Sequence, residues 1–244
     1  MRAFTPLLMA LSAGVLVAPI SRAAGQGFDF SGVVGYLALV NTPTAGVVPV
    51  ARQWMLAEPR TGTGVDVQYG RIADDDDHFD DLVGGVSLPF AQGHADVAIQ
   101  GGFFLPSCSG EGCDPEFVAS AAVEGSLLRS STPNALLNVG LAGRLGFGKP
   151  ADATALSASV GLPISVAVGR AGGVQLVPFI TPAFGWGRLS GGGDSESGTR
   201  LMLGGGLGVM NGKSGLGVNV GIQKVFIDGG RTVFGAGITW SGVR

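Results

Sequence analysis

The sequence predicts an all-β protein, an antiparallel transmembrane β-barrel of ten strands that follows a cleaved signal peptide. Three observations predict this class. The N-terminal residues have the pattern of an export signal. The rest of the chain is apolar, yet it lacks the run of about 20 apolar residues that a membrane-spanning helix needs. Along many segments apolar residues alternate with small or polar ones, as in strands that face lipid on one side.

The composition excludes several function classes. Only 14% of the 244 residues are charged and 44 are glycine. Such a chain is too apolar to be disordered and too poor in charge for an ordinary soluble enzyme. The formal net charge of −3 provides no basic patch, so nucleic acid is not expected as a partner. We expect no cofactor.

Residues 1–23 are predicted to be a secretory signal peptide. Arg2 supplies the positive start, 3–20 is uncharged and mostly apolar, and Ser21 and Ala23 are the small residues before a cleavage point. The barrel is predicted over 61–244. The intervening segment, 24–60, has no clean period and is interpreted as a periplasmic extension, a lumen plug or two further strands. Twelve strands are therefore the alternative to the favoured ten.

The strands are assigned from a two-residue period, which a helix with 3.6 residues per turn would not show. Within 135–147, for example, Leu137 and Val139 alternate with Asn138 and Gly140. The ten predicted strands span 61–71, 79–90, 94–105, 116–128, 135–147, 153–168, 174–188, 199–210, 215–226 and 231–241.

Three prolines conflict with this pattern. Pro163 lies in the sixth predicted strand, and Pro178 and Pro182 lie in the seventh. A proline removes one donor from the hydrogen-bond ladder, and a closed barrel has no free edge to accommodate it. We therefore expect bulges, or broken strands, at these positions.

Loop lengths and aromatic residues give an orientation. The longest connections, 73–79, 106–115 and 190–198, all fall at one end, which is expected to be external. Both termini are then periplasmic. Aromatic residues are expected in girdles at the two membrane interfaces. Those near the external strand ends are Tyr69, Phe79, Phe103, Phe104, Phe117, Phe147, Phe184, Trp186 and Phe226, and those near the periplasmic ends are Phe90 and Trp240.

The export signal, the two-residue repeat and the last strand RTVFGAGITW (231–240) resemble small outer-membrane β-barrel proteins of Gram-negative bacteria. The resemblance covers about 61–241 and carries no residue-specific motif. Typical members end on an aromatic residue, whereas here Trp240 is followed by SGVR. The resemblance implies that the chain resides in the bacterial outer membrane and that its lipid is a partner.

The run ADDDDHFDD (73–81) is the first candidate site. Asp74, Asp75, Asp76 and Asp77 are weak candidates for binding a divalent cation such as calcium, but they lack the spacing of a calcium loop. A solvated acidic loop is the favoured interpretation. Omptin-like outer-membrane proteases suggest a second interpretation, in which Asp76 and His78 activate water. No opposing aspartate pair is recognisable, and we predict that the chain is not an enzyme.

The second candidate site is the lumen. A set of polar residues is predicted to point inward: Asp66, Gln68, Asp96, Gln100, Glu124, Asn138, Arg144, Arg200, Asn219 and Gln223. Glu124 and Arg144 lie on neighbouring strands, and we expect them to pair. Structural filling of a narrow barrel is favoured over a selectivity lining, since buried charges must be paired.

The only cysteines, Cys108 and Cys113, lie in the predicted external loop 106–115. An exported loop enters an oxidising compartment, where disulfides persist. Two thiols without a nearby histidine make a poor zinc site. We therefore predict a Cys108–Cys113 disulfide that clips the loop.

These observations favour a non-enzymatic membrane protein that is structural or passes small solutes passively. The alternative is a surface-binding or adhesion module that uses the acidic and disulfide-clipped external loops. A rim hydrolase is the third and least favoured reading.

Overall fold

The structure, a computed structural model, describes residues 62–74, 77–106, 115–149, 153–169, 173–226 and 232–242. The predicted signal peptide and the segment 24–60 lie outside these residues. Within them the only helix is the single 3-10 turn η1 (Ala91–Gly93), and no helix is long and apolar enough to cross a membrane.

Eleven strand segments make up the described fold, and each overlaps one of the predicted strands. They are β1 (Gly64–Asp74), β2 (Asp77–Phe90), β3 (Ala95–Pro106), β4 (Glu116–Thr132), β5 (Ala135–Gly148), β6 (Thr154–Gly161), β7 (Ile164–Gly169), β8 (Val174–Gly191), β9 (Asp194–Asn211), β10 (Leu216–Phe226) and β11 (Thr232–Ser241).

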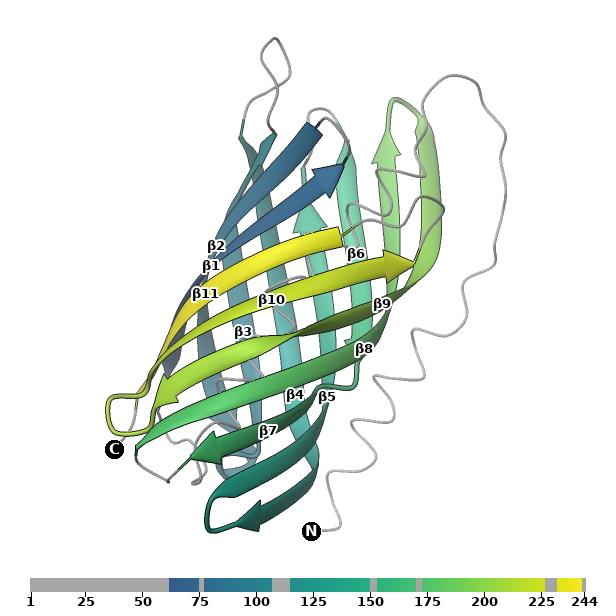
Figure 1. Cartoon of the computed structure of the whole chain (residues 1–244). Coiled ribbons are helices and arrows are strands. Elements are labelled where there is room, and N and C mark those ends of the chain that lie inside the picture. The colour runs from purple at the N-terminus through teal and green to yellow at the C-terminus, as the bar shows by residue number, and fades with distance from the viewer. Residues whose placement is uncertain are drawn as a thin grey trace.

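The strands form one closed antiparallel ring with ten positions (Figure 1). Apart from β6 and β7, each strand pairs with its neighbours in sequence, and β1 pairs with β11 to close the ring. β6 and β7 share one position, because both pair with β5 on one side and β8 on the other. The ten-strand prediction is confirmed, and the ring leaves no place for the two further strands of the twelve-strand alternative.

The interruption between β6 and β7 has a local cause. Both segments keep one register against β5 and one against β8, so they are a single strand broken at Leu162 and Pro163. In β8, by contrast, Pro178 and Pro182 lie within one continuous strand and remain paired with Leu207 and Leu203 of β9. The expected break therefore occurs at one of the three prolines.

The two faces of the sheet differ in chemistry, as the two-residue period requires. Large apolar side chains such as Ile99, Leu145, Leu201 and Ile238 are exposed on the outside of the ring. Polar and small residues are buried on the inside. This inside-out arrangement is the pattern of a barrel whose outer surface contacts lipid.

The ring has two rims, which we name from Figure 1. The upper rim carries the connections after β1, β3, β5, β8 and β10, and the lower rim carries those after β2, β4, β7 and β9. The C-terminal strand ends at the lower rim, where the Ser241 N–H donates to the Gly215 carbonyl in the β9–β10 turn at 2.8 Å.

Two predicted upper-rim loops are shorter than expected. β1 and β2 continue to Asp74 and Asp77, and the 190–198 segment is mostly strand, with a turn at Gly192 and Gly193 only. Both glycines have positive φ, of 60° and 94°, which glycine adopts without steric cost. These polar residues therefore extend hairpins. The β8–β9 hairpin rises at the upper right of Figure 1, and Asp194–Arg200 continues beyond the end of its β10 partner.

Candidate functional site: the barrel interior

The interior contains a polar network at about mid-height, built by β1, β3, β4 and β5. The Asp66 carboxylate accepts hydrogen bonds from the side-chain amides of Gln68 and Gln100, the latter at 2.9 Å. The Gln100 carbonyl oxygen in turn accepts from Arg144 Nη1 at 3.3 Å and from the Ser120 hydroxyl at 3.3 Å. These contacts tie four strands together along the inner face of one part of the wall.

The network ends in the ion pair that the sequence predicts. Arg144 Nη2 lies 3.8 Å from Glu124 Oε1, and the two side chains are 3% and 1% exposed. Glu124 also lies opposite Asp96 in the β3–β4 register. A buried carboxylate needs such a partner, because transferring a charge out of water without compensation is costly.

A glycine makes the Asp66–Gln100 contact possible. β2 lies between β1 and β3, and its Gly85 pairs with Asp66 on one side and Gln100 on the other. A Cβ at Gly85 would lie 2.6 Å from Gln100 Cγ and 3.0 Å from Asp66 Oδ1. Because Gly85 has no side chain, the two polar groups meet directly above it.

The remaining predicted lumen residues also lie on the inward side. Asp96, Asn138, Asn219 and Gln223 are buried. The Asn138 side-chain oxygen accepts from the Ser126 hydroxyl at 2.8 Å, and Gln223 Nε2 lies 3.3 Å from the Met202 sulfur. Arg200 is only partly buried, and its Nη1 donates to the Thr199 carbonyl at 2.7 Å.

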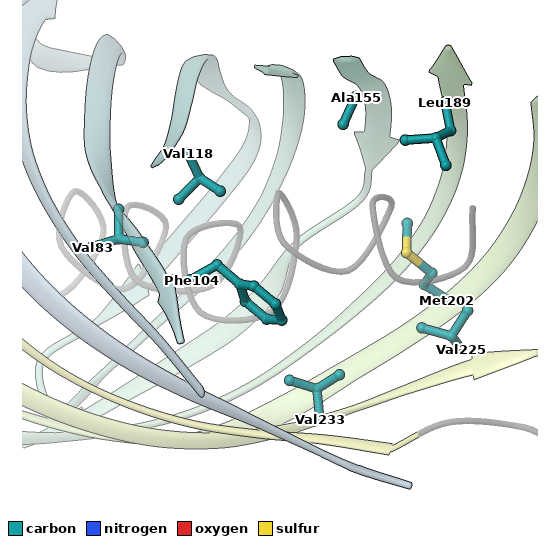
Figure 2. Packing of buried hydrophobic residues seen from close by; sticks show 8 residues of the cluster. All are labelled: Val83, Phe104, Val118, Ala155, Leu189, Met202, Val225 and Val233. Atoms are coloured by element: carbon teal, nitrogen blue, oxygen red, sulfur yellow. The ribbon is translucent and has the colours of Figure 1, made fainter. Parts of the chain in front are cut away.

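Two apolar clusters lie on the inside of the wall, above and below this network, and the sequence analysis did not anticipate them. The upper cluster is drawn from eight strands and its side chains point into the barrel (Figure 2). Its members are Val83, Phe104, Val118, Ala155, Leu189, Met202, Val225 and Val233. The lower cluster comprises Leu136, Ala167, Val177 and Met210. The two-residue alternation places each of them on the inward side. An apolar residue there looks the same in the sequence as one that faces lipid, so the clusters themselves could not be recognised.

Phe104 corrects one part of the aromatic prediction. It is 3% exposed and belongs to the upper interior cluster, so it is not part of the external girdle. The adjacent Phe103 is exposed on the outside and packs edge-on against Phe117, with ring centroids 6.4 Å apart. Consecutive strand residues point to opposite faces, so only one of the two can face lipid.

The acidic run divides between the described and undescribed residues. Asp74 and Asp77 end β1 and begin β2, where they are paired in register, while Asp75 and Asp76 lie outside the described residues. The predicted cation site there stays a prediction. His78 pairs in register with Ala73, and with Asp76 outside the described residues the histidine–aspartate hypothesis is untested.

The two aspartates that end the run point to opposite faces. Asp81 is buried inside. Asp80, on the outside, accepts from Arg71 Nε at 2.8 Å, Arg71 Nη2 at 3.0 Å and the Tyr69 hydroxyl at 2.8 Å. The bidentate contact between Arg71 and Asp80 links β1 to β2 near the upper rim. Because Arg71 is exposed, the ion pair contributes little to stability.

Cys108 and Cys113 lie outside the described residues, so their disulfide stays a prediction. Among the described residues, no group of three or more histidine, aspartate or glutamate side chains is arranged to hold a metal ion.

Taken together, the closed ring and the apolar outer surface define the class of protein: an outer-membrane-type β-barrel. No protein-family model matches the chain, and no curated protein matches it.

Solved barrel structures resemble it at low identity. The β domain of the Bordetella autotransporter BrkA has a TM-score of 0.42 and 13% identity, covering 75% of this chain and 100% of that one. The outer membrane enzyme PagL has a TM-score of 0.36 and 13% identity, covering 72% and 99%. Ail, the attachment invasion locus protein of Yersinia pestis, has a TM-score of 0.30 and 14% identity, covering 75% and 99%. The assignment of class rests on the ring itself.

Proposed function

We propose that this chain is a structural β-barrel protein of the bacterial outer membrane whose interior is closed to hydrated ions. The burial of the interior polar groups carries this proposal. In a water-filled channel the charged lining is wet, whereas here Arg144 and Glu124 are 3% and 1% exposed and Asp66 and Gln100 are 1% and 3% exposed. Their hydrogen bonds join β1, β3, β4 and β5, so the charged groups are satisfied by one another rather than by water.

The placement in the membrane is supported by the outer surface. Its apolar side chains belong to every strand position of the ring, and aromatic residues such as Tyr69, Phe117 and Phe226 lie toward the upper rim while Trp240 lies at the lower rim. Two aromatic girdles around an apolar band are typical of outer-membrane barrels. The upper rim would then face outside the cell.

Planar-bilayer conductance tests the closed interior. The purified chain is expected to give no steady single-channel current at low voltage. Replacing Gln100 and Arg144 with alanine removes the centre of the network and is expected to produce measurable current. Val97→Ala, an outward change on β3, is the matched control and is expected to leave the current at zero. Steady current from the unmodified chain would instead favour a narrow passage for small solutes.

The β8–β9 hairpin supports a second candidate function, surface binding. Both strands have 18 residues, which exceeds the 9–11 residues that cross a bilayer. At the tip, Arg188 Nη2 donates to the Ser195 hydroxyl at 3.2 Å. Replacing 191–194 with a two-residue Asn-Gly turn should keep the barrel folded, and loss of cell-surface adhesion in that variant would support this function.

A further inference from the structure

We propose that the wall of this barrel has a lateral opening at β6–β7 and β8, through which an acyl chain passes between the bilayer and the lower interior. We call this part of the wall, residues 162–167 and 177–182, the proline seam. The inference rests on the membrane placement proposed above, and it adds a ligand class and a site to a barrel that is otherwise closed to water.

Two backbone hydrogen bonds are missing across the seam, and a third is missing beside it, between the broken strand and β5. In the shared β6–β8 and β7–β8 register, Leu162 lies opposite Pro182, and Val166 lies opposite Pro178. The Leu162 N–H donates to the Pro182 carbonyl at 2.9 Å. In an antiparallel sheet such a pair exchanges two bonds, and the return bond to the Leu162 carbonyl is missing because proline has no N–H.

The same reasoning applies at the other two prolines. Pairs 166–178 and 167–177 are the ones missing from the otherwise regular β7–β8 register, and both depend on a donor at Pro178. On the far side of the broken strand, the Gly140 N–H donates to the Pro163 carbonyl at 2.8 Å, and Pro163 cannot return the bond. The carbonyls of Gly140, Leu162 and Val166 therefore all lose their ladder donor within one short stretch of wall.

This loss is confined to one side of β8. On its other side, β8 pairs with β9 at every residue from Val174 to Gly191, including both prolines. The two prolines therefore direct their missing donors toward β6–β7 and leave β8–β9 intact. A strand held firmly on one side and weakly on the other provides a line along which the wall separates.

The inner side of the seam is suited to an apolar chain. Val177 and Ala167 belong to the lower interior cluster with Leu136 and Met210, and all four are at most 7% exposed. Phe179 faces inward beside them and is 8% exposed. An acyl chain that entered here would exchange one apolar environment, the bilayer, for another.

A polar group inside the seam supplies a second, independent observation. Thr181 is 8% exposed, and its hydroxyl is buried with no hydrogen-bond partner. It lies on β8 between Phe179 and Pro182, at the level where the β6–β7 strand is broken. Buried polar groups without a partner cost free energy, and a ligand with a carboxyl or ester oxygen would accept a hydrogen bond from this hydroxyl.

Bromine-labelled lipid measures the proposed entry directly, because bromine quenches tryptophan fluorescence only at contact range. Phe179→Trp in a background with Trp54, Trp186 and Trp240 replaced by phenylalanine places the only tryptophan inside the seam; we call this variant the seam reporter. In vesicles of dibrominated phosphatidylcholine its fluorescence is expected to be quenched. Phe104→Trp in the same background, the control reporter, is the matched inward change on β3, and it is expected to be unquenched.

Variants that restore the missing backbone N–H donors test whether the acyl chain enters through the seam. Pro178→Val with Pro182→Val should close it and reduce the quenching of the seam reporter to the level of the control reporter. Ile180→Val, an outward change between the two prolines, should leave the quenching unchanged. Pro178→Val alone is the fallback if the double variant does not fold. A seam reporter quenched no more than the control reporter, or quenching that survives the restored donors, would overturn the proposal.

Two further measurements identify the source of the acyl chain and test the membrane placement separately. Quenching by dibrominated phosphatidylcholine identifies a membrane lipid, whereas quenching only by added dibromostearate identifies a free fatty acid, and either supports the opening. A variant that keeps Trp240 alone, with Trp54 and Trp186 replaced by phenylalanine, reports the placement, since Trp240 is 50% exposed on the outside. If Trp240 is quenched and the seam reporter is not, only the lateral opening fails. If Trp240 is not quenched, the membrane placement fails.

Discussion

At the scale of single residues, inward glycines determine which side chains can meet inside the barrel. Gly206 on β9 is the clearest case. A Cβ there would lie 2.5 Å from Phe179 Cζ and closer still to the Val220 carbonyl oxygen. The glycine therefore lets the Phe179 ring lie against the wall, which keeps an aromatic side chain within the narrow interior.

Gly206→Ala is expected to destabilise the barrel by about 1–3 kcal/mol, because overpacking forces both a ring and a backbone carbonyl to move. Gly143→Ala is the matched control, since a Cβ at Gly143 meets nothing within 4 Å. Denaturant unfolding in detergent micelles checks the difference. Equal stability of the two variants would contradict the packing account.

The Arg144–Glu124 pair supports a second residue-scale prediction. Arg144→Met leaves Glu124 buried without its cation, which is expected to cost about 3–5 kcal/mol in the free energy of unfolding. Adding Glu124→Leu removes the uncompensated charge, so the double variant should recover most of the loss in the same unfolding measurement. A double variant less stable than Arg144→Met would show that the pair is not the source of the effect.

Sequence reasoning worked well for residues whose chemistry conflicts with lipid. A charged or amide side chain in a strand whose other face is apolar has to point inward. The sequence therefore predicts the inward orientation of Asp66, Gln100 and Arg144. Thr181 and Phe179 were not recognised, because a threonine or phenylalanine is compatible with either face. Their importance depends on the neighbours that the register brings to them.

At the scale of elements, the two-residue period located all ten strand positions. Ends were predicted less well: β4, β8 and β9 run several residues past the predicted ends, because polar residues at a hairpin tip remain paired although they leave the apolar alternation. The prolines were recognised as irregular. Only the register reveals that Pro163, Pro178 and Pro182 withdraw donors from the same stretch of wall.

The amides of β7 are expected to exchange with solvent deuterium faster than those of β10. β7 has lost pairing with β8 at Val166 and Ala167 and follows directly on the break at Leu162 and Pro163, whereas β10 keeps an unbroken register with β9 over its whole length. Local opening is easiest where backbone hydrogen bonds are fewest. Exchange measured by mass spectrometry on peptides covering 164–169 and 216–226 checks this, and equal protection would argue against a weakened seam.

At the scale of the whole molecule, the closed ring predicts resistance to detergent. Every strand position has two neighbours, so the ring has no edge strand with unpaired backbone groups from which SDS could start to unfold it. The unheated protein is expected to migrate in SDS gels at a position different from the boiled protein, and to bind to detergent micelles. A chain that dissolves without detergent and shows no shift would not be a membrane barrel.

The joining of β1 to β11 also has a consequence for assembly. Gly64 pairs with Ser241, so the first and last of the described strands must pair although most of the barrel sequence lies between them. Such long-range pairing is slow, since the entropy of closing the intervening loop opposes it until contacts form. Until β11 arrives, both ends of the growing sheet display unsatisfied backbone groups that invite aggregation. A chain truncated before Thr232 should therefore aggregate more readily than the full chain and be cleared faster by proteolysis.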